Sequence, residues 1–342
     1  MMMQSGFFDL QNRYQKLSAL GDPLEVINEV VEWERFRGVL QRALKKPRKN
    51  SAGRKAYDVV LMFKVLVLQS LYNLSDEQTE YQIRDRFSFM RFLGLTPEAG
   101  VPDAKTVWLY RESLKQAGAI DELFATFEGY LTGRGYQAQK GTVIDARMVE
   151  VPRQRNTREE NQTLQDGLIP AEWVEQPAKL AQKDTEARWT QKQGQHYYGY
   201  KNHIAIDVKH KLVRGFTVTP ASTHDSQEFE TLVKVPNTLQ AVWADGAYQS
   251  EAHAALLERR GIHNHVHERP WREQTLTPTQ QRRNQRRSRI RARVEHVFGH
   301  QVNTMKQTIL RTIGQARAEI KIGLANLAYN MSRRGQLERR TT

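Results

Sequence analysis

The sequence has no cysteine among its 342 residues, so it can form no disulfide bond and no thiolate metal site. Long hydrophobic runs are also missing. The most apolar stretch, Val59–Tyr72, is too short to span a bilayer and contains Lys64. The opening residues, MMMQSGFFDL, have neither the charged start nor the apolar run of a secretory signal peptide. We therefore expect a protein of a reducing cell interior, with Val59–Tyr72 as a buried helix.

Acidic residues are in deficit. The 52 lysines and arginines outnumber the 38 aspartates and glutamates, which gives a net charge of +14 and a pI near 9.9. An excess of this size indicates a polyanionic partner, nucleic acid before an anionic membrane surface. With 39% hydrophobic residues the chain can bury a sizeable core, and its length suggests about two domains.

Residues 1–135 are predicted to be helical throughout, because apolar side chains recur there at helical spacing. Ser75 opens a capping-box pattern, and Asp103 is expected to cap a later helix. Short capped helices are typical of a helix-turn-helix-like DNA-binding module, but also of a simple helical bundle, and the sequence leaves both interpretations open. A basic linker, LKKPRKNSAGRK, interrupts the helices, and its Arg48 and Arg54 are predicted to contact DNA.

A second region, residues 138–334, alternates strands with helices. A strand at 141–151 is followed by a polar insertion, about 151–196, and by two strands that meet at a tight turn near 209–211. Helices then alternate with short strands, and the C-terminal helices cover about 279–334. Without the insertion the order is β-β-β-α-β-α-β-α, which predicts a mixed α/β sheet with helices on its faces. This is also the element order of the ribonuclease H-like fold.

Two aspartates stand at the ends of predicted strands, Asp145 on the first and Asp245 on the fourth. Functional groups gather at strand ends in open α/β sheets, so these carboxylates are expected to lie close together and to repel each other. A divalent cation removes that repulsion. Mg²⁺ prefers oxygen ligands, and two such ions about 3.5–4 Å apart can clamp the attacking and leaving oxygens of a phosphodiester displacement.

The third carboxylate of this hypothesis is Glu295, on the last basic helix. At four-residue spacing it shares a helix face with Arg287 and Arg291, while Val294 and Val297 belong to an apolar stripe that would dock on the sheet. Arginine binds phosphate through its planar fork, so the basic residues of this helix are predicted to hold DNA. They are Arg282, Arg283, Arg286, Arg287, Arg289, Arg291 and Arg293. The alternative is a solvated basic helix with one incidental glutamate.

Two further candidate DNA contacts are Lys201, on a predicted strand beside the expected site, and His224, which precedes a predicted helix capped by Asp225. Trp173 and Trp189 in the insertion either act on DNA as a wedge or form a small local core, and the pattern favours neither. Three histidines on one strand would supply zinc ligands in poorly compatible directions, so a polar or DNA-facing edge is favoured there: His263, His265 and His267.

Phrases along almost the whole chain resemble bacterial insertion-sequence transposases of the DDE type, in particular the insertion-sequence-five family. The N-terminal phrases are FKVLVLQSLYNLSD, IRDRFSFMRFLGL and PDAKTVWLYRESL. The later phrases are IDARMVEVPRQRNTREEN, HDSQEFETL, ADGAY and RARVEHVFG. The chain departs from the family at Ser288 and Val302, where related transposases often carry a tyrosine and a lysine.

The resemblance implies that Asp145, Asp245 and Glu295 form the catalytic, metal-binding triad, which would hold two Mg²⁺ ions, with Mn²⁺ as a substitute. It also implies a ribonuclease H-like core with an insertion after the first strand, preceded by a helical region for DNA binding and dimerisation. The expected activity is phosphodiester cleavage and strand transfer, from the terminal inverted repeats of an insertion sequence into double-stranded target DNA. Because two DNA ends must be joined, we expect a homodimer or larger assembly, in the bacterial cytoplasm at the nucleoid and without a membrane partner.

Two alternatives stay open at this stage. A ribonuclease H-like structure-specific nuclease would cut DNA junctions without requiring inverted repeats. A non-catalytic DNA-binding regulator derived from a transposase would nick no DNA. The presence of all three acids argues against the regulator.

Overall fold

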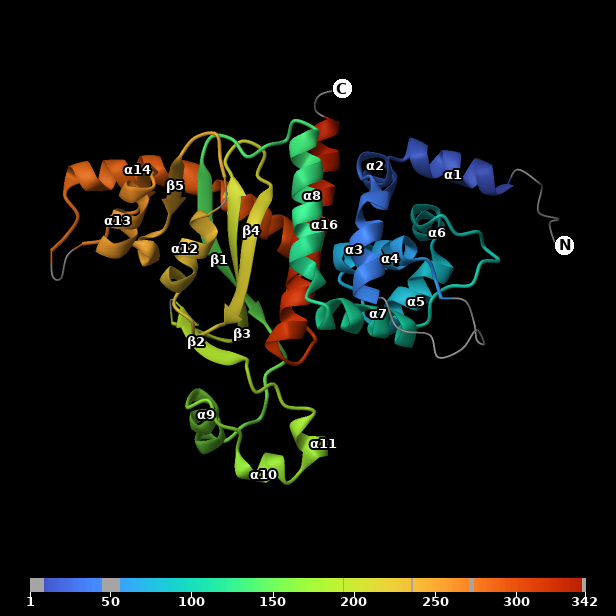
Figure 1. The fold of residues 1–342 in the computed structure, drawn as a ribbon, viewed down its shortest axis with the longest axis horizontal. Helices are drawn as coiled ribbons and strands as arrows, with labels where there is room; N and C mark the ends of the chain where they lie inside the picture. Colours follow the sequence, from blue (N-terminus) through green and yellow to red (C-terminus); the bar gives the residue numbers. More distant parts are fainter. Residues whose placement is uncertain (1–8, 45–55, 193, 235, 271–273, 340–342) are drawn as a thin grey trace. The chain divides into compact units, whose positions relative to one another are not determined.

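The computed structural model describes residues 9–44, 56–192, 194–234, 236–270 and 274–339 (Figure 1). The chain divides into two compact units. The first comprises Met1–Phe127 and Leu324–Thr342, and the second comprises Glu128–Gly323. This division begins the second unit before the expected residue 138 and assigns the end of the last helix to the first unit. The arginines Arg48 and Arg54 lie outside the described residues, so their DNA contact stays a prediction.

The N-terminal unit is helical, as predicted. Its elements are α1 (Asp9–Ala19), α2 (Pro23–Val30), η1 (Trp33–Phe36), α3 (Arg37–Leu44), α4 (Val59–Tyr72), α5 (Asp76–Asp85), α6 (Phe87–Leu93), α7 (Ala104–Gln116) and the first part of α8 (Ala119–Gly133). The local signals are confirmed: Ser75 forms a capping box at the start of α5, and Asp103 caps α7 by accepting a hydrogen bond from the Thr106 backbone.

Helix α4 is the buried helix that its apolar sequence predicted. Most of its side chains are buried, and the rings of Trp33 and Phe36 from η1 pack on Phe63 at this core, with Phe92 of α6 packing on Trp33. Such burial on all sides explains why the helix lacks a polar face. In the part of the chain that the structure describes, no single helix has the length and apolarity needed to cross a bilayer. Helices α4 and α5 together pass that test of length and composition, with a bend of 101° between them.

The second unit is built on one six-stranded mixed sheet. Its strands are β1 (Thr142–Glu150), β2 (Arg188–Lys192), β3 (Gln195–Asp207), β4 (Val213–Pro220), β5 (Ala241–Ala244) and β6 (His263–Val266). The long strand β3 pairs antiparallel with β1 and β4, and β2 pairs with its first residues. β5 lies parallel to β1, and β6 lies parallel to β5. Apart from β2, the order β4-β3-β1-β5-β6 confirms the ribonuclease H-like arrangement.

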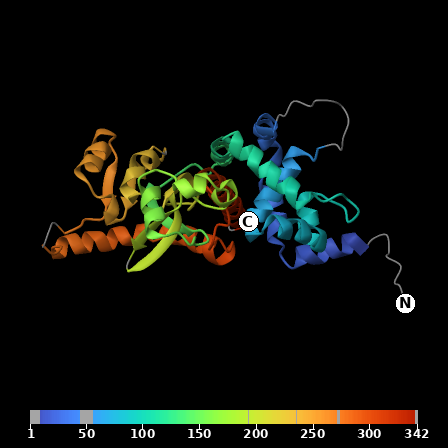
Figure 2. The same ribbon diagram turned by 90° about the horizontal axis from the view of Figure 1, so that it is seen from below.

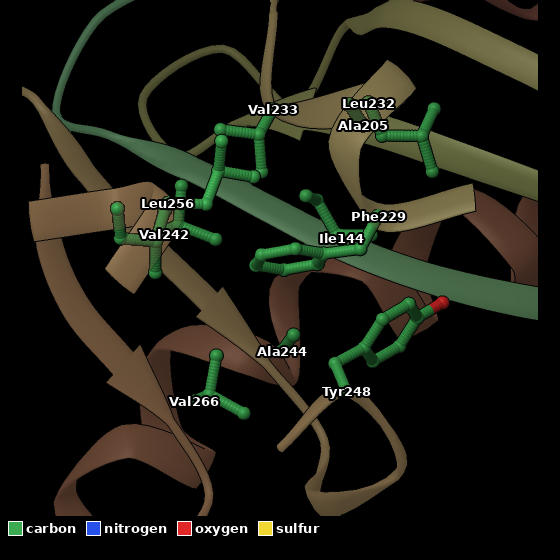
Figure 3. Packing of buried hydrophobic residues seen from close by; sticks show 11 residues of the cluster. Ile144, Ala205, Phe229, Leu232, Val233, Val242, Ala244, Tyr248, Leu256 and Val266 are labelled. Carbon is green, nitrogen blue, oxygen red and sulfur yellow. The ribbon is translucent and has the colours of Figure 1, made fainter. Parts of the chain in front are cut away.

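Helices cover both faces of this sheet. After the 3-10 turn η2 (Asp225–Glu228), the helices α12 (Phe229–Val233) and α13 (Glu251–Arg259) pack on one face. Figure 3 shows their core, in which Ile144 and Ala205 of the sheet contact Phe229 and its neighbours. Helices α14 (Pro278–Arg291) and α15 (Arg293–Gly299) contact β1 from the other side, which the turned view in Figure 2 separates from α13. Because side chains alternate along a strand, Asp145 points away from the core that holds Ile144.

Two expected helices differ in detail. The helix expected to be capped by Asp225 begins as η2, and its N-cap is His224, whose ring Nδ1 accepts from the Ser226 backbone. Asp225 is instead engaged in an ion pair with Lys201. The long basic helix is interrupted at Ala292 between α14 and α15, continues as a π-helical turn (His300–Thr304), and is followed by α16 (Gln315–Glu338).

The insertion contains three short helices with a core of their own, α9 (Arg158–Gln165), α10 (Ala171–Val174) and α11 (Pro177–Leu180), seen together below β2 in Figure 1. Trp173 is fully buried there, with its indole Nε1 donating to Glu160 at 2.7 Å and Lys183 over its ring. This confirms the local-core interpretation for Trp173. Trp189 of β2 packs on Tyr198, with Arg153 over its ring.

Candidate active site

Strand register brings the two aspartates level with each other on the neighbouring strands β1 and β5, where the acidic residues of the site gather; this place is called the acidic edge below. In the parallel ladder between β1 and β5, Thr142 pairs with Val242 and Val143 with Trp243, so two residues later Asp145 is level with Asp245. Asp245 Oδ1 accepts from the Ala247 backbone at 2.7 Å, which caps the short 3-10 turn η3 (Gly246–Tyr248). The loop after β5 therefore fixes one carboxylate beside the other.

Asp145 is an enclosed carboxylate, with a side chain only 13% exposed. Burial, together with a smaller effect of the charge of Asp245, raises its pKa from 3.8 to about 6, against the opposing effects of Arg291 and the Ala146 backbone N–H. The protein alone therefore favours the neutral form of Asp145 over the ionised form up to about pH 6. A divalent cation at this edge would supply the missing positive charge.

Arg291 connects the third predicted acid to this pair. Its Nη1 lies 2.7 Å from Asp145 Oδ2, and its Nη2 lies 3.8 Å from Glu295 Oε1. Glu295 is on the first turn of α15, with a side chain 65% exposed. The basic helices therefore bring both the carboxylate of Glu295 and the guanidinium of Arg291 to Asp145. Val294 and Val297 on the inner side of α15 are fully buried, as the apolar stripe predicted.

The carboxylates of Asp145 and Asp245 fit a divalent cation, because both present hard oxygen ligands at one edge and need a counter-charge. Over the described ranges, however, no group of three or more histidine, aspartate or glutamate side chains is arranged to hold a metal ion. The predicted cluster of three carboxylates is not assembled in this structure. Glu295 is joined to Asp145 through the guanidinium of Arg291 rather than through a shared ligand position.

Sequence reasoning did not identify Tyr248, which also belongs to this edge. Its hydroxyl is buried and has no hydrogen-bond partner within the described part of the chain. Burial raises its pKa well above 10, and so do the nearby carboxylates of Asp225, Asp145, Asp245 and Glu228. Figure 3 shows its ring in the core, with the hydroxyl at the end away from Val266. The available signal was its place three residues after Asp245, inside the phrase ADGAY.

Lys201 does not have the position that a DNA contact requires. Its side chain is 8% exposed, and its Nζ donates to Asp225 Oδ1 at 2.7 Å and to the Thr223 carbonyl at 2.6 Å. The predicted DNA contact of Lys201 is therefore wrong in this structure, because the ammonium is buried and already paired with the carboxylate of Asp225. His203 lies beside this pair, and burial lowers its pKa to about 4, which keeps the ring neutral near pH 7.

The seven arginines of the basic helix divide into two groups. Arg287 donates to the Val266 carbonyl and pairs with Glu268, and Arg293 donates to the Val208 carbonyl, so both attach the helix to the sheet rather than reach for DNA. Arg291 is engaged by Asp145. Four arginines are exposed on α14 and keep their predicted role as candidate phosphate ligands: Arg282, Arg283, Arg286 and Arg289. Of these, Arg283 also pairs with Glu268, at 2.9 Å from its Oε2.

Two histidine predictions have different outcomes. His224 is exposed, so its DNA contact stays a prediction. The three histidines near β6 do not form a zinc site among the described residues, since His265 stacks on the Trp243 ring at 4.8 Å and His267 lies near Ser288.

Comparison with known proteins shows the family to which this chain belongs. The family model described as "Transposase DDE domain" matches residues 136–331, which is more than half of the chain. The model described as "Transposase domain (DUF772)" matches residues 11–113. Among solved structures, the chain is similar to "Cryo-EM structure of piggyBac transposase synaptic complex with hairpin DNA", with a TM-score of 0.43, 11% identity, and coverage of 92% of this chain and 76% of that chain. The chain thus belongs to the DDE transposases, polynucleotidyl transferases of DNA transposition, with the pairing of two domains that is typical of the insertion-sequence-four and insertion-sequence-five types.

Proposed function

We propose that this transposase binds the terminal inverted repeats of an insertion sequence, cleaves them, and transfers the freed strand to target DNA. In this proposal Asp145, Asp245 and Glu295 are the catalytic carboxylates. The protein acts as a homodimer or larger assembly on DNA, because two ends must be joined, and it works at the bacterial nucleoid. The observation that carries the proposal is the alignment of Asp145 with Asp245 on β1 and β5, with Glu295 linked to Asp145 through Arg291.

The three carboxylates would hold two Mg²⁺ ions, or Mn²⁺ in their place. When bound, such ions supply Lewis acidity and counter-charge to the attacking and leaving oxygens of the phosphodiester. The sheet contributes rigidity, because Asp145 lies within β1, Asp245 directly follows β5, and each accepts a backbone hydrogen bond. Their direction is therefore set before DNA arrives, which lowers the cost of organising the site.

DNA phosphates are held by the exposed arginines of α14, the helix that precedes Glu295 in the chain. A water molecule attacks the phosphodiester at the element end and frees a 3′ hydroxyl, and that hydroxyl then attacks target DNA in line. Both steps are direct displacements at phosphorus, so no covalent bond between protein and DNA is formed.

The test uses DNA that carries the inverted repeats flanking this reading frame, incubated with the full chain and Mg²⁺ or Mn²⁺. The Asp145→Asn variant is expected to lose cleavage while binding the same DNA as tightly as the wild type, because the arginines are untouched. Glu172→Gln removes an exposed carboxylate in the insertion and is expected to cleave normally. Full cleavage by Asp145→Asn would remove the catalytic assignment.

The same assay separates the two rival functions. A structure-specific nuclease would cut branched junctions equally well without the repeats, and a DNA-binding regulator would nick no substrate with either metal. Light scattering on the DNA complex tests the expected assembly of two or more chains.

A further inference from the structure

Arg291 contacts two of the three acids of the proposed site. One terminal nitrogen donates to Asp145 Oδ2 at 2.7 Å, and the other lies 3.8 Å from Glu295 Oε1. A divalent cation that takes Asp145 as a ligand needs the same carboxylate and is repelled by a guanidinium at this distance. The ion pair and a metal ion thus compete for Asp145.

The guanidinium is positioned to leave this pair. Its side chain is 24% exposed, and its buried Nε has no hydrogen-bond partner among the described residues. The planar fork is therefore only partly used by the protein. Because a phosphate can accept two parallel hydrogen bonds from such a fork, it is a strong competitor for the carboxylate. Arg286 and Arg289, exposed on the same helix, would bring a DNA backbone near.

We propose that Arg291 is an internal counter-ion, which withholds Asp145 and Glu295 from metal ions until a DNA phosphate takes over its guanidinium. This inference rests on the proposed function, since it assumes that those acids hold the metal. The consequence is that DNA and metal bind cooperatively, because a DNA phosphate takes Arg291 away from Asp145 and a metal ion replaces Arg291 as the counter-charge of Asp145. Free protein then carries a poorly loaded site, and loading follows DNA binding.

The experiment measures Mn²⁺ binding to the full, DNA-free chain by the paramagnetic resonance signal of the free ion. It is done near pH 8, above the pKa of about 6 at Asp145, so that protons do not compete. Arg291→Gln is expected to bind Mn²⁺ about ten-fold more tightly than the wild type, within the usual range for coupled sites. Arg289→Gln removes the same charge from the exposed side of the helix and is expected to leave the Mn²⁺ affinity unchanged. Equal or weaker binding by Arg291→Gln overturns the proposal.

A second arm measures the coupling. Addition of a short random-sequence duplex at low salt is expected to increase the Mn²⁺ affinity of the wild type but not that of Arg291→Gln. The same gain in both proteins overturns the role of Arg291. Arg291→Lys, which keeps the charge without the fork, is expected to be intermediate, and it carries the test if the glutamine variant does not fold.

Asp145→Asn separates this inference from the proposed function. If Asp145→Asn binds Mn²⁺ as the wild type does in the presence of the duplex, the metal site itself is misassigned. If Asp145→Asn loses Mn²⁺ binding while Arg291→Gln matches the wild type, the site stands and the counter-ion role is refuted.

Discussion

The carboxylate of Asp145 should make the metal-free protein less stable as the pH rises. Its pKa is raised to about 6 in the folded protein, mainly by burial, whereas the ordinary value is 3.8. The folded protein therefore binds this proton more tightly than the unfolded chain does. The contribution to the free energy of unfolding is fully present below about pH 3.8 and is lost as the pH rises through 6.

The magnitude follows from the two values. At 1.36 kcal/mol for each pH unit between 3.8 and about 6, the total loss is about 3 kcal/mol. About 2 kcal/mol of it falls between about pH 4.5 and pH 8. Asparagine stays neutral over this range, so Asp145→Asn is expected to gain that amount relative to the wild type.

The assay is urea unfolding in EDTA, followed by circular dichroism at several pH values, and the quantity of interest is the difference in unfolding free energy between the two proteins. Other titrating groups cancel in this difference. Glu172→Gln, which changes an exposed carboxylate, is the matched control and should show no comparable trend. Parallel curves for Asp145→Asn and the wild type would refute the reasoning, and a wild type that gains stability with pH would show that Arg291 outweighs burial.

Three further predictions concern side chains around the site. Tyr248→Phe removes a buried hydroxyl that has no partner in the part of the chain that the structure describes, and it is expected to keep or raise the melting temperature. Tyr200→Phe, whose hydroxyl donates to Asp184 at 2.8 Å, should lose about 1–3 kcal/mol. Scanning calorimetry of both variants tests this, and a large loss in Tyr248→Phe contradicts it. Lys201→Met leaves Asp225 buried without its counter-charge and should lower the free energy of unfolding in urea by about 3–5 kcal/mol. The double variant with Asp225→Asn should recover much of that loss, and no recovery would contradict a pairwise role. Replacing Arg282, Arg286 and Arg289, all exposed on α14, with glutamine should weaken DNA binding. The slope of log affinity against log salt concentration, measured by fluorescence anisotropy, should fall in magnitude by up to about 3. An unchanged slope would show that DNA does not contact these three arginines.

Several features could be predicted from the sequence because their causes are local. A capping box needs residues three apart in the chain, so Ser75 and Asp103 could be placed before any fold was known. The order of strands and helices follows from hydrophobic spacing, and it was enough to indicate a mixed sheet of the ribonuclease H-like kind. The burial of Val294 and Val297 likewise follows from helical periodicity.

The partners of the charged side chains could not be predicted in this way. Lys201 and Asp225 are separated by 24 positions, and Arg291 and Asp145 by 146. No local pattern specifies which acid meets which base at such separations, because the pairing depends on strand register and on where a helix docks. Arg287 and Arg293 were therefore indistinguishable in sequence from the exposed arginines around them, although Arg287 binds a backbone carbonyl of β6 and Arg293 one directly after β3.

By itself, the sequence determined the element order, the caps and the buried faces, since each depends on composition or on short-range spacing. It also indicated the three acids, whose catalytic role is the proposal made above. Only the tertiary structure decided that Asp145 of β1 is level with Asp245 at the end of β5 and that Arg291 lies between Asp145 and Glu295. It alone also decided that the buried Tyr248 hydroxyl has no hydrogen-bond partner among the described residues. The physical reason is range: hydrogen-bonded turns and side-chain periodicity act within a few residues, whereas charge pairing and desolvation act between groups that folding alone brings together.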